Sequence, residues 1–211
     1  MPRILLVDDH QAVQAGLRAL LSSGFPDVQI ELANSEQSLF AALANGHWEL
    51  VVLDLQLAGR GGLELIPELK QMRPQVKVLV YTMHSESEFG LRAFRSGADG
   101  FLPKDRPVED LFTAVRQMLQ GRKYLSSDLA ERLASAAAGN FEAEPHESLS
   151  SREYEVFCLL AEGATHSEVA AKLHINTKTV STYQARIYDK LQVKTRSDLT
   201  RYAIKHGLKW Q

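Results

Sequence analysis

The chain has 211 residues, of which 45% are hydrophobic, and its formal net charge is −2. This length suits two small domains, each with its own core. The sequence excludes a membrane helix of roughly 18 apolar residues, a signal-peptide core, and any internal disulfide or cysteine metal cluster, since Cys158 is its one cysteine. We expect a cytoplasmic protein with no membrane partner.

The net charge conceals a difference along the chain. Residues 172–211 carry nine Lys or Arg and two Asp, a charge of +7, so the remaining residues carry −9. A basic segment beside an acidic body favours an anionic partner. An ordinary solvated helical surface is the alternative, and charge alone does not separate the two.

The first 120 or so residues alternate strand and helix patterns. Apolar and β-branched runs predict strands at 4–7, 28–32, 50–53, 76–81 and 100–102. Helical patterns occupy 11–22, 36–45, 62–72, 86–95 and 107–120. This alternation predicts an α/β fold, a doubly wound parallel five-stranded sheet with helices on both faces.

Strand patterns end after Gly121. An Ala-rich helix is predicted at 126–138, then a linker at 139–147. Further helices are predicted at 151–162, 167–173, 177–191 and 197–206. We therefore divide the chain into an α/β domain at 1–121, a linker with a helix at 122–147, and an all-α four-helix domain at 148–211.

Polar side chains follow the predicted strands at their carboxyl ends. Asp8 and Asp9 follow the first strand, Asp54 the third, Thr82 the fourth and Lys104 the fifth. The carboxyl ends of parallel strands meet at one edge of a sheet, so we expect these side chains to lie together. Clustered carboxylates indicate Mg²⁺, a hard cation that also binds phosphate.

Such a cluster has the chemistry to accept a phosphoryl group. Asp54 would be the nucleophile and form an acyl phosphate. Lys104 and the metal would neutralise its charge, and Thr82 would donate a hydrogen bond to it. Each residue alone has a plainer explanation: Asp9 as a helix cap, Thr82 as a turn residue, Lys104 as a surface cation. Their joint order favours the phosphoryl site.

The surrounding motifs resemble the receiver domain of response regulators over residues 1–120. The motifs are Leu5-Leu6-Val7-Asp8-Asp9-His10, Val52-Leu53-Asp54-Leu55, Tyr81-Thr82 and Gly97-Ala98-Asp99-Gly100-Phe101-Leu102-Pro103-Lys104. The resemblance implies a flavodoxin-like fold and phosphorylation of Asp54 by a sensor histidine kinase. It also implies that Mg²⁺ is held by Asp8, Asp9, Asp54 and the backbone carbonyl of Gln56.

The resemblance further implies a switch. Thr82 would move to the phosphoryl group and the ring of Phe101 would turn inward. The loop at 57–62 departs from the family, with Leu-Ala where Met-Pro is usual and with extra glycine. Gln56 and His84 stand where the family tunes the lifetime of the phosphoryl group.

The C-terminal domain has a helix-turn-helix pattern. Ser150 and Glu153 form a capping-box signature before a helix that stops at Gly163. A short second helix ends in a turn at 174–176, where Asn176 caps a third helix. Two helices joined by a short turn can set the second into the major groove. A generic helical bundle is the alternative, and the basic segment favours double-stranded DNA.

The helix at 177–191 has two contrasting faces. Val180, Ile187 and Leu191 recur at helical spacing and form its inward face. The opposite face carries short polar and basic groups suited to bases and phosphates, and more cations follow it. The predicted DNA-contacting residues are Lys178, Ser181, Thr182, Tyr183, Ala185, Arg186, Lys190, Lys194 and Arg196.

The same domain resembles the LuxR-type helix-turn-helix. Its motifs are Leu149-Ser150-x-Arg152-Glu153-x-Glu155-Val156, Glu168-Val169-Ala170-x-x-Leu173 and Lys178-Thr179-Val180, with Ile187, Lys190-Leu191 and Val193. Both halves together resemble the NarL/FixJ class, which implies a homodimer on DNA through the helix at 197–206, with RNA polymerase downstream. Ser181 and Tyr183 replace the family's frequent Lys and His. The run at 179–183 is similar to that of a subgroup paired with multi-step hybrid kinases.

We therefore predict a phosphorylation-controlled transcription factor, not an enzyme. One alternative is a phosphate-independent factor whose first domain only dimerises, and the complete acidic site argues against it. A haloacid-dehalogenase-like phosphatase is another, but it would need a second Asp where Gln56 stands. A kinase-binding module without a DNA role is the third, and salt-dependent DNA binding would separate it from our prediction.

Overall fold

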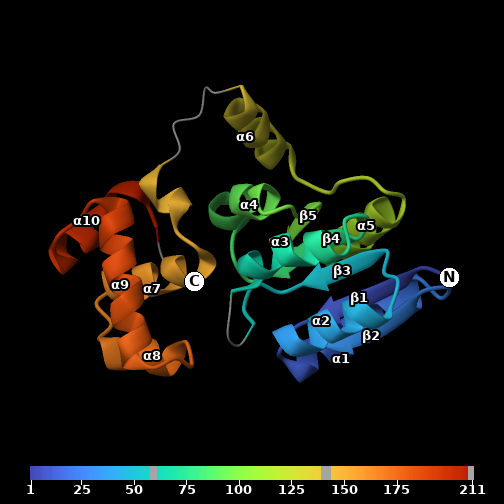
Figure 1. Cartoon of the computed structure of the whole chain (residues 1–211). Helices are drawn as coiled ribbons and strands as arrows, with labels where there is room; N and C mark the ends of the chain where they lie inside the picture. The colour runs from blue at the N-terminus through green and yellow to red at the C-terminus, as the bar shows by residue number, and fades with distance from the viewer. Residues whose placement is uncertain (58–60, 139–143, 209–211) are drawn as a thin grey trace. The chain divides into compact units, whose positions relative to one another are not determined.

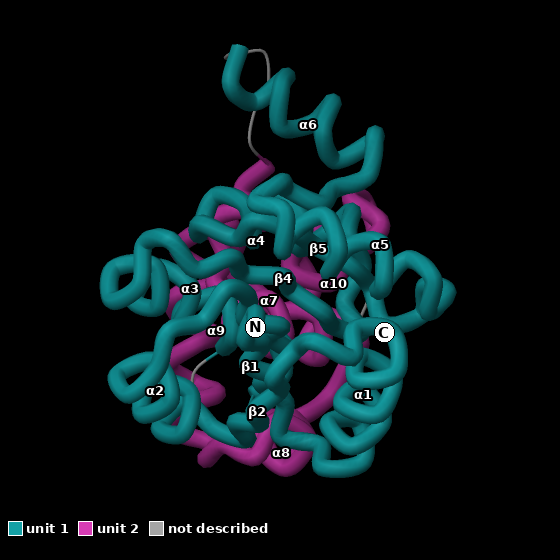
Figure 2. Tube along the Cα trace, turned by 90° about the vertical axis from the view of Figure 1, so that its right-hand side faces the viewer, with its two compact units in different colours: residues 1–141 teal, residues 142–211 magenta. Residues whose placement is uncertain are grey.

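The computed structural model describes residues 1–57, 61–138 and 144–208. The chain divides into two units, residues 1–141 and 142–211 (Figure 2). Loop residues 58–60 and linker residues 139–143, which the sequence motifs covered, lie outside the described residues. The domain boundaries at 121 and 147 stay predictions.

Apolar runs build the sheet of the first unit. The strands are β1 (Arg3–Val7), β2 (Gln29–Ala33), β3 (Leu50–Leu53), β4 (Lys77–Thr82) and β5 (Gly100–Pro103). They pair in parallel in the order β2-β1-β3-β4-β5 (Figure 1). All four residues of β3 are buried because the central strand is covered on both faces. The doubly wound parallel sheet predicted from the sequence is confirmed.

Helices cover both faces of this sheet. They are α1 (Gln11–Gly24), α2 (Glu36–Asn45), α3 (Gly62–Met72), α4 (Glu86–Arg95) and α5 (Val108–Leu119). In Figure 2, α1 and α5 lie on one side of the sheet, and α2 and α3 lie on the other. Because side chains alternate along a strand, Ile4 and Leu6 of β1 enter the core that Leu17 and Leu111 complete from α1 and α5.

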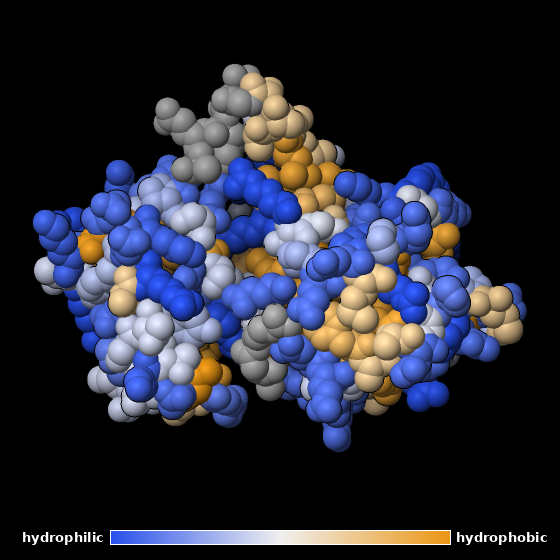
Figure 3. All heavy atoms as spheres, viewed as in Figure 1, coloured by the Kyte–Doolittle hydropathy of each residue, from blue (hydrophilic) through white to orange (hydrophobic). Residues whose placement is uncertain are grey.

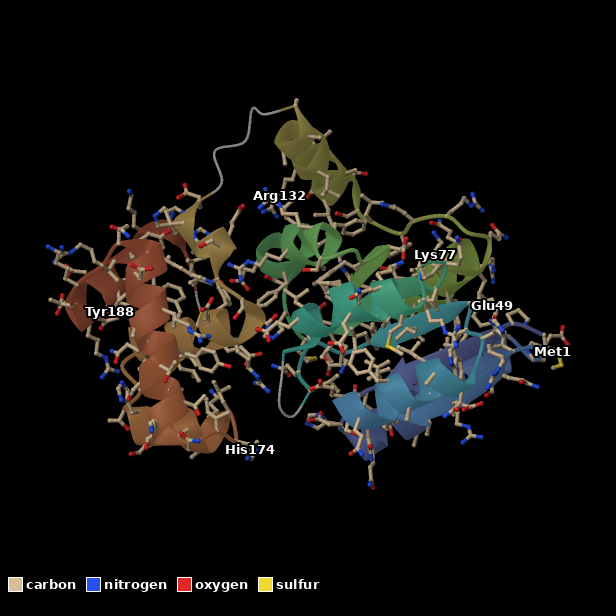
Figure 4. The ribbon with its side chains drawn as sticks, viewed as in Figure 1. Met1, Glu49, Lys77, Arg132, His174 and Tyr188 are labelled. Carbon is tan, nitrogen blue, oxygen red and sulfur yellow. The ribbon has the colours of Figure 1, made fainter. Side chains whose placement is uncertain are left out.

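The helix of the connector belongs to the first unit and packs against α4. This helix, α6 (Ser127–Ala137), is capped by Ser126, whose side chain accepts a hydrogen bond from the Leu129 amide. Figure 3 shows hydrophobic side chains along α6. Leu129, from the same helix, is only 1% exposed. Arg132 points from α6 toward α4, where its Nη1 donates to the Ser87 carbonyl at 2.7 Å (Figure 4).

The second unit is helical throughout its described part. Its elements are a short 3₁₀ turn η1 (Pro145–Ser148), then α7 (Ser151–Ala161), α8 (His166–Lys172), α9 (Thr177–Leu191) and α10 (Arg196–His206). The predicted capping box is present, since the Ser150 side chain accepts from Glu153 N and the Glu153 side chain accepts from Ser150 N. The predicted Asn176 cap is also present, and Gly163 has a φ of +105° after α7.

The core of the second unit lies between its helices. Val180, Ile187 and Leu191 of α9 are buried, as their helical spacing predicted. Phe157 of α7 meets Tyr202 of α10 edge-to-face, with ring centroids 6.2 Å apart. This lies within the range of about 4.5–7 Å that aromatic pairs prefer. Within the described residues of both units, no helix has the length and apolar character needed to cross a bilayer.

Candidate functional site

Three strands of the first unit bring a cation between two carboxylates. Asp8 directly follows β1, Asp54 directly follows β3, and Lys104 directly follows β5. Lys104 Nζ lies 2.7 Å from Asp8 Oδ2 and 2.7 Å from Asp54 Oδ2. Asp8 and Asp54 are 2% and 3% exposed. The parallel register makes this meeting possible, because β3 pairs with β1 and both strands end at the same edge.

The charges of this cluster depend on one another. Burial alone would lower the pKa of Lys104, but Asp54 and Asp8 outweigh it and hold the pKa above its usual value. Lys104 is therefore a cation fixed against two carboxylates, and not the surface lysine that its sequence alone also allowed. A fixed cation beside a carboxylate is suited to stabilising a phosphoryl group on that carboxylate.

Asp9 and His10 lie at the mouth of the cluster. The N-cap of α1 is His10, so the plainer explanation of Asp9 as the helix cap is wrong. His10 Nδ1 lies 2.8 Å from Asp9 Oδ1 and 3.4 Å from Asp8 Oδ1. We did not single out His10 from the sequence, although its position directly after two aspartates was the available signal.

The oxygen donors at this edge fit a hard divalent cation. Asp8 and Asp9 each offer a carboxylate oxygen, and these atoms lie within 4.8 Å of one another. The Asp54 carboxylate lies close by, since Lys104 Nζ contacts both Asp8 and Asp54. Carboxylate oxygens are ligands that Mg²⁺ prefers. The backbone amide of Gln56 donates to Asp54 Oδ1 at 3.2 Å, while a role for its backbone carbonyl as a metal ligand stays a prediction.

Thr82 and His84 border the cluster from the end of β4. Thr82 is fully buried; its hydroxyl oxygen accepts from the His84 amide at 3.4 Å, and its carbonyl accepts from the Lys104 amide at 2.7 Å. The His84 ring stacks on Phe89 of α4, with centroids 4.1 Å apart. The position that would sense the phosphoryl group is therefore linked to α4.

Phe101, the other predicted switch residue, is bonded to the connector. Its ring is buried at 1% exposure. The Phe101 amide donates to the Tyr124 carbonyl at 3.2 Å, and the Tyr124 amide donates to the Asp99 carbonyl at 3.0 Å. Tyr124 thus adds a short parallel bridge to the outer edge of β5 at Gly100. The sequence contains no strand pattern there that would have revealed this pairing.

Asp99 forms a second charged cluster before β5. Lys70 Nζ lies 2.5 Å from one carboxylate oxygen, Lys77 Nζ lies 3.2 Å from the other, and the Val78 amide donates at 3.1 Å. Burial alone would raise the pKa of Asp99, but these partners outweigh it and hold the pKa below its usual range. Lys77, labelled in Figure 4, comes from the start of β4. We interpret this cluster as structural.

In the second unit, α9 presents the polar face predicted for DNA contact. Tyr183 is half-buried, and the following predicted contacts are exposed: Lys178, Ser181, Thr182, Ala185, Arg186, Lys190 and Lys194. A hollow of about 340 Å³ on this face is lined by Asn176, Lys178, Thr179, Thr182, Tyr183 and Arg186. His174 precedes the hollow in the turn before α9 (Figure 4).

Two of the predicted DNA contacts also hold the second unit together. Lys190 Nζ lies 2.5 Å from Glu153 Oε2 and donates to the Ser148 carbonyl at 3.0 Å. Arg196 Nε donates to the Leu160 carbonyl at 3.2 Å, and its Nη2 donates to the Ala164 carbonyl. Periodicity could not reveal these bonds because their partners lie more than 30 positions away. Phosphate contact by either residue stays a prediction.

Sequence comparison decides what kind of protein has these features. Residues 4–116, more than half of the chain, match the response regulator receiver domain family. The chain belongs to the response regulator family. Residues 147–203 match the luxR family of bacterial regulatory proteins. The protein is therefore a two-component response regulator with a LuxR-type DNA-binding domain, which makes it a regulator of transcription and not an enzyme.

Similar proteins align with this response regulator along nearly its whole length. The response regulator UvrY of Escherichia coli O6:H1 is 31% identical over 99% of this chain and 96% of its own. RcsB of Salmonella enterica serovar Typhimurium, bound to the P1flhDC promoter with the phosphomimetic BeF₃⁻, is 25% identical over 95% and 97%, with a TM-score of 0.58. A structure of two RcsB dimers on two parallel DNAs is also 25% identical, over 96% and 98%, with a TM-score of 0.59.

Proposed function

We propose that this response regulator is switched by phosphorylation of Asp54 by a sensor histidine kinase, and that the switch controls its dimerisation and its sequence-specific binding to DNA. The observation that carries the proposal is Lys104 Nζ, held 2.7 Å from both Asp54 and Asp8. A buried carboxylate with a fixed cation beside it has the charge arrangement that phosphoryl transfer requires. The run 179–183 supports a kinase of the multi-step hybrid class.

The residues around Asp54 have separate tasks in this proposal. The Asp54 carboxylate attacks the phosphorus of the kinase's phosphohistidine, and the P–N bond breaks as the imidazole leaves. Lys104 then moves from pairing two carboxylates to pairing the phosphoryl oxygens. Thr82 turns its hydroxyl toward the phosphoryl group, giving up the bond from the His84 amide. Asp8, Asp9, Asp54 and the Gln56 backbone carbonyl would hold Mg²⁺, which would supply positive charge to offset the incoming phosphoryl oxygens.

The hydrogen bond between Phe101 of β5 and Tyr124 supports a route by which the phosphorylation signal leaves the receiver. Movement of Phe101 displaces an amide that is bonded to Tyr124, and Tyr124 leads within five residues to α6. Leu129 of α6 contacts Gly90 of α4, since a Cβ built on Gly90 would lie 3.0 Å from Leu129 Cδ2. The observed and the displaced positions of Phe101 would be two arrangements in equilibrium. A ligand shifts that equilibrium only as far as it binds one arrangement more tightly than the other. The phosphoryl group supplies that preference here.

The DNA-binding half acts through α9. Lys178, Arg186 and Lys194 supply charge for phosphates, while Ser181, Thr182 and Tyr183 supply hydrogen-bonding groups. Ala185 offers a small surface for close approach, and Lys190 and Arg196 fix the helices that carry these groups. The structure of two RcsB dimers on two parallel DNAs supports a homodimer on DNA. The resemblance to the NarL/FixJ class supports α10 as the element that joins the two copies, each reading one half-site. The proposed setting is the cytoplasm, with RNA polymerase as the downstream partner.

Phosphorylation is tested directly by mass. The full chain, incubated with Mg²⁺ and a small phosphodonor such as acetyl phosphate, gains the mass of one phosphoryl group. The gain disappears with Asp54→Asn and with chelation of Mg²⁺. Asp105→Asn is the matched control, because Asp105 directly follows Lys104 in the sequence and leaves the cluster intact. A gain that survives Asp54→Asn contradicts the proposal.

DNA binding is tested on genomic fragments. The phosphorylated chain protects a small set of sites with two-fold symmetry, and Asp54→Asn incubated with the same donor protects them at higher protein concentration. Affinity that does not change with salt concentration contradicts binding through DNA phosphates. Affinity that is equal for both proteins, with and without donor, contradicts control by phosphorylation.

A further inference from the structure

The start of the second unit lies beside the end of α10, and metal-ligating side chains meet there. Glu144 and His146 come from the segment of η1, and His206 is the last residue of α10. One ligand atom from each lies within 4.8 Å of the others. The phosphoryl site uses none of these residues.

The spacing of these atoms suits a transition metal. His206 Nδ1 lies 3.6 Å from Glu144 Oε2, and the rings of His146 and His206 are 5.4 Å apart between centroids. With bonds of about 2.0–2.1 Å, two neighbouring ligands of tetrahedral Zn²⁺ lie about 3.4 Å apart. A shift within the reach of side-chain rotation would bring the three groups to that spacing.

Tyr202 supports both imidazoles. Its hydroxyl lies 3.1 Å from His146 Nδ1, and its ring stacks on His206 with centroids 4.3 Å apart. Metal-bound histidines are commonly oriented by a hydrogen bond at the other ring nitrogen. With Nδ1–H of His146 donating to Tyr202, Nε2 carries the lone pair that a metal needs.

We propose that Glu144, His146 and His206 form a Zn²⁺ site that ties the end of the connector to α10. Two imidazoles and one carboxylate select Zn²⁺ over Mg²⁺, which prefers oxygen ligands, and a water molecule would complete the tetrahedron. His146 and His206 are 60 positions apart, so the ion closes a long loop and stabilises the second unit when bound. It also fixes where the connector enters the DNA-binding unit.

The alternative is a metal-free cluster. The Glu144–His206 pair and the stacking of Tyr202 on His206 could hold this corner by themselves. The two alternatives differ in saturable binding of Zn²⁺ and in the spectrum of a bound reporter ion, which an ion pair and a stacked ring do not produce.

The test uses the full chain, free of any histidine tag, in excess Mg²⁺ so that the carboxylates of Asp8 and Asp9 are occupied. Calorimetric titration with Zn²⁺ should give one site per chain, and Co²⁺ should give the visible absorption of a four-coordinate ion. His206→Gln and His146→Gln should each weaken binding by at least about tenfold and remove the Co²⁺ band. His47→Gln, an exposed histidine of the first unit, should bind as the parent does.

Circular dichroism checks that each variant is folded, and Glu144→Gln provides a further variant that should not disturb the fold. The Glu144 side chain is 49% exposed, so its substitution should leave the fold intact while weakening Zn²⁺ binding. Zn²⁺ should raise the unfolding midpoint of the parent chain and leave that of His206→Gln unchanged. The proposal fails if the parent shows no saturable Zn²⁺ binding, if His206→Gln binds as the parent does, or if His10→Gln removes the binding instead.

Discussion

The backbone amide of Phe101 donates a hydrogen bond to the carbonyl oxygen of Tyr124 across 3.2 Å. A residue of the connector is thus paired directly with the strand that carries the proposed switch ring. The connector then docks on α4 through α6. Two separate contacts, one at β5 and one at α4, therefore join the receiver to the segment that leads to the DNA-binding unit.

Leu129 should control how firmly α6 is docked. Leu129→Ala removes a side chain that is 1% exposed, which costs about 2 kcal/mol or more of local stability. Amide hydrogen exchange across Ser127–Ala137 should accelerate at least about tenfold while exchange in β1 and β3 is unchanged. Glu131→Ala, at an exposed position of the same helix, is the control. Equal effects from both variants would mean that Leu129 does not anchor α6.

Gly62 should tolerate no side chain. A Cβ at this position would lie 2.6 Å from the Asp54 carbonyl oxygen and 2.7 Å from Leu55 Cα, and both are backbone atoms. Gly62→Ala should destabilise the receiver by about 2–4 kcal/mol in urea unfolding. It should also slow phosphorylation, because the strain falls on the residue that carries the nucleophile.

Gly16 provides the matched control for that substitution. Among the described residues, no heavy atom outside its own helix and chain neighbours lies within 4 Å of a Cβ built on it. Gly16→Ala in α1 should therefore stabilise the chain by about 0.5–1 kcal/mol through helix propensity. If both glycine variants change the free energy of unfolding in urea alike, the close backbone contact at Gly62 does not destabilise Gly62→Ala.

Asp99 should make stability depend on acid pH. Its pKa is held below the usual range in the folded chain, so its contribution is fully present above the unfolded pKa, about 3.9, and is lost as pH falls through the folded pKa. Asp99→Asn should cost about 1–3 kcal/mol near pH 6, with a smaller deficit below pH 4. Urea unfolding at both pH values measures this, and exposed Asp27→Asn should show no such convergence.

Arg186 should contribute to DNA binding chiefly through charge. Arg186→Ala on the exposed face of α9 removes a cation beside the hollow at Lys178 and Tyr183. Affinity for a footprinted site should fall, and the slope of log affinity against log salt should decrease by about 1. Arg18→Ala, an equal charge change at an exposed position of α1, should leave the slope unchanged. An unchanged slope for Arg186→Ala would exclude it as a phosphate contact.

Local sequence patterns predicted the elements of this protein well because its helices and strands carry their own signals. Ser150 and Asn176 marked helix starts that the structure confirms. The contact between Lys104 and Asp54, which are 50 positions apart, could be predicted because a parallel sheet aligns the carboxyl ends of its strands. In such cases topology turns local patterns into a predicted site.

Other contacts could not be predicted because no periodic pattern accompanies them. Tyr124 pairs with β5 through backbone atoms alone, so its side chain gives no signal. Arg196 was expected to approach DNA from its charge, yet its guanidinium donates to carbonyls of 160 and 164. Whether a cation serves an anionic partner or a nearby carbonyl depends on folded geometry that composition does not contain.

The pairing of Tyr124 with β5 also bears on how the receiver can be isolated. A fragment that ends at residue 121 lacks Tyr124 and leaves the Phe101 amide exposed on an edge strand. Open edge strands pair with other chains and promote aggregation. A fragment that continues to the end of α6 keeps this edge occupied and covers Gly90 with Leu129. The connector therefore protects the receiver from self-association as well as joining it to the DNA-binding unit.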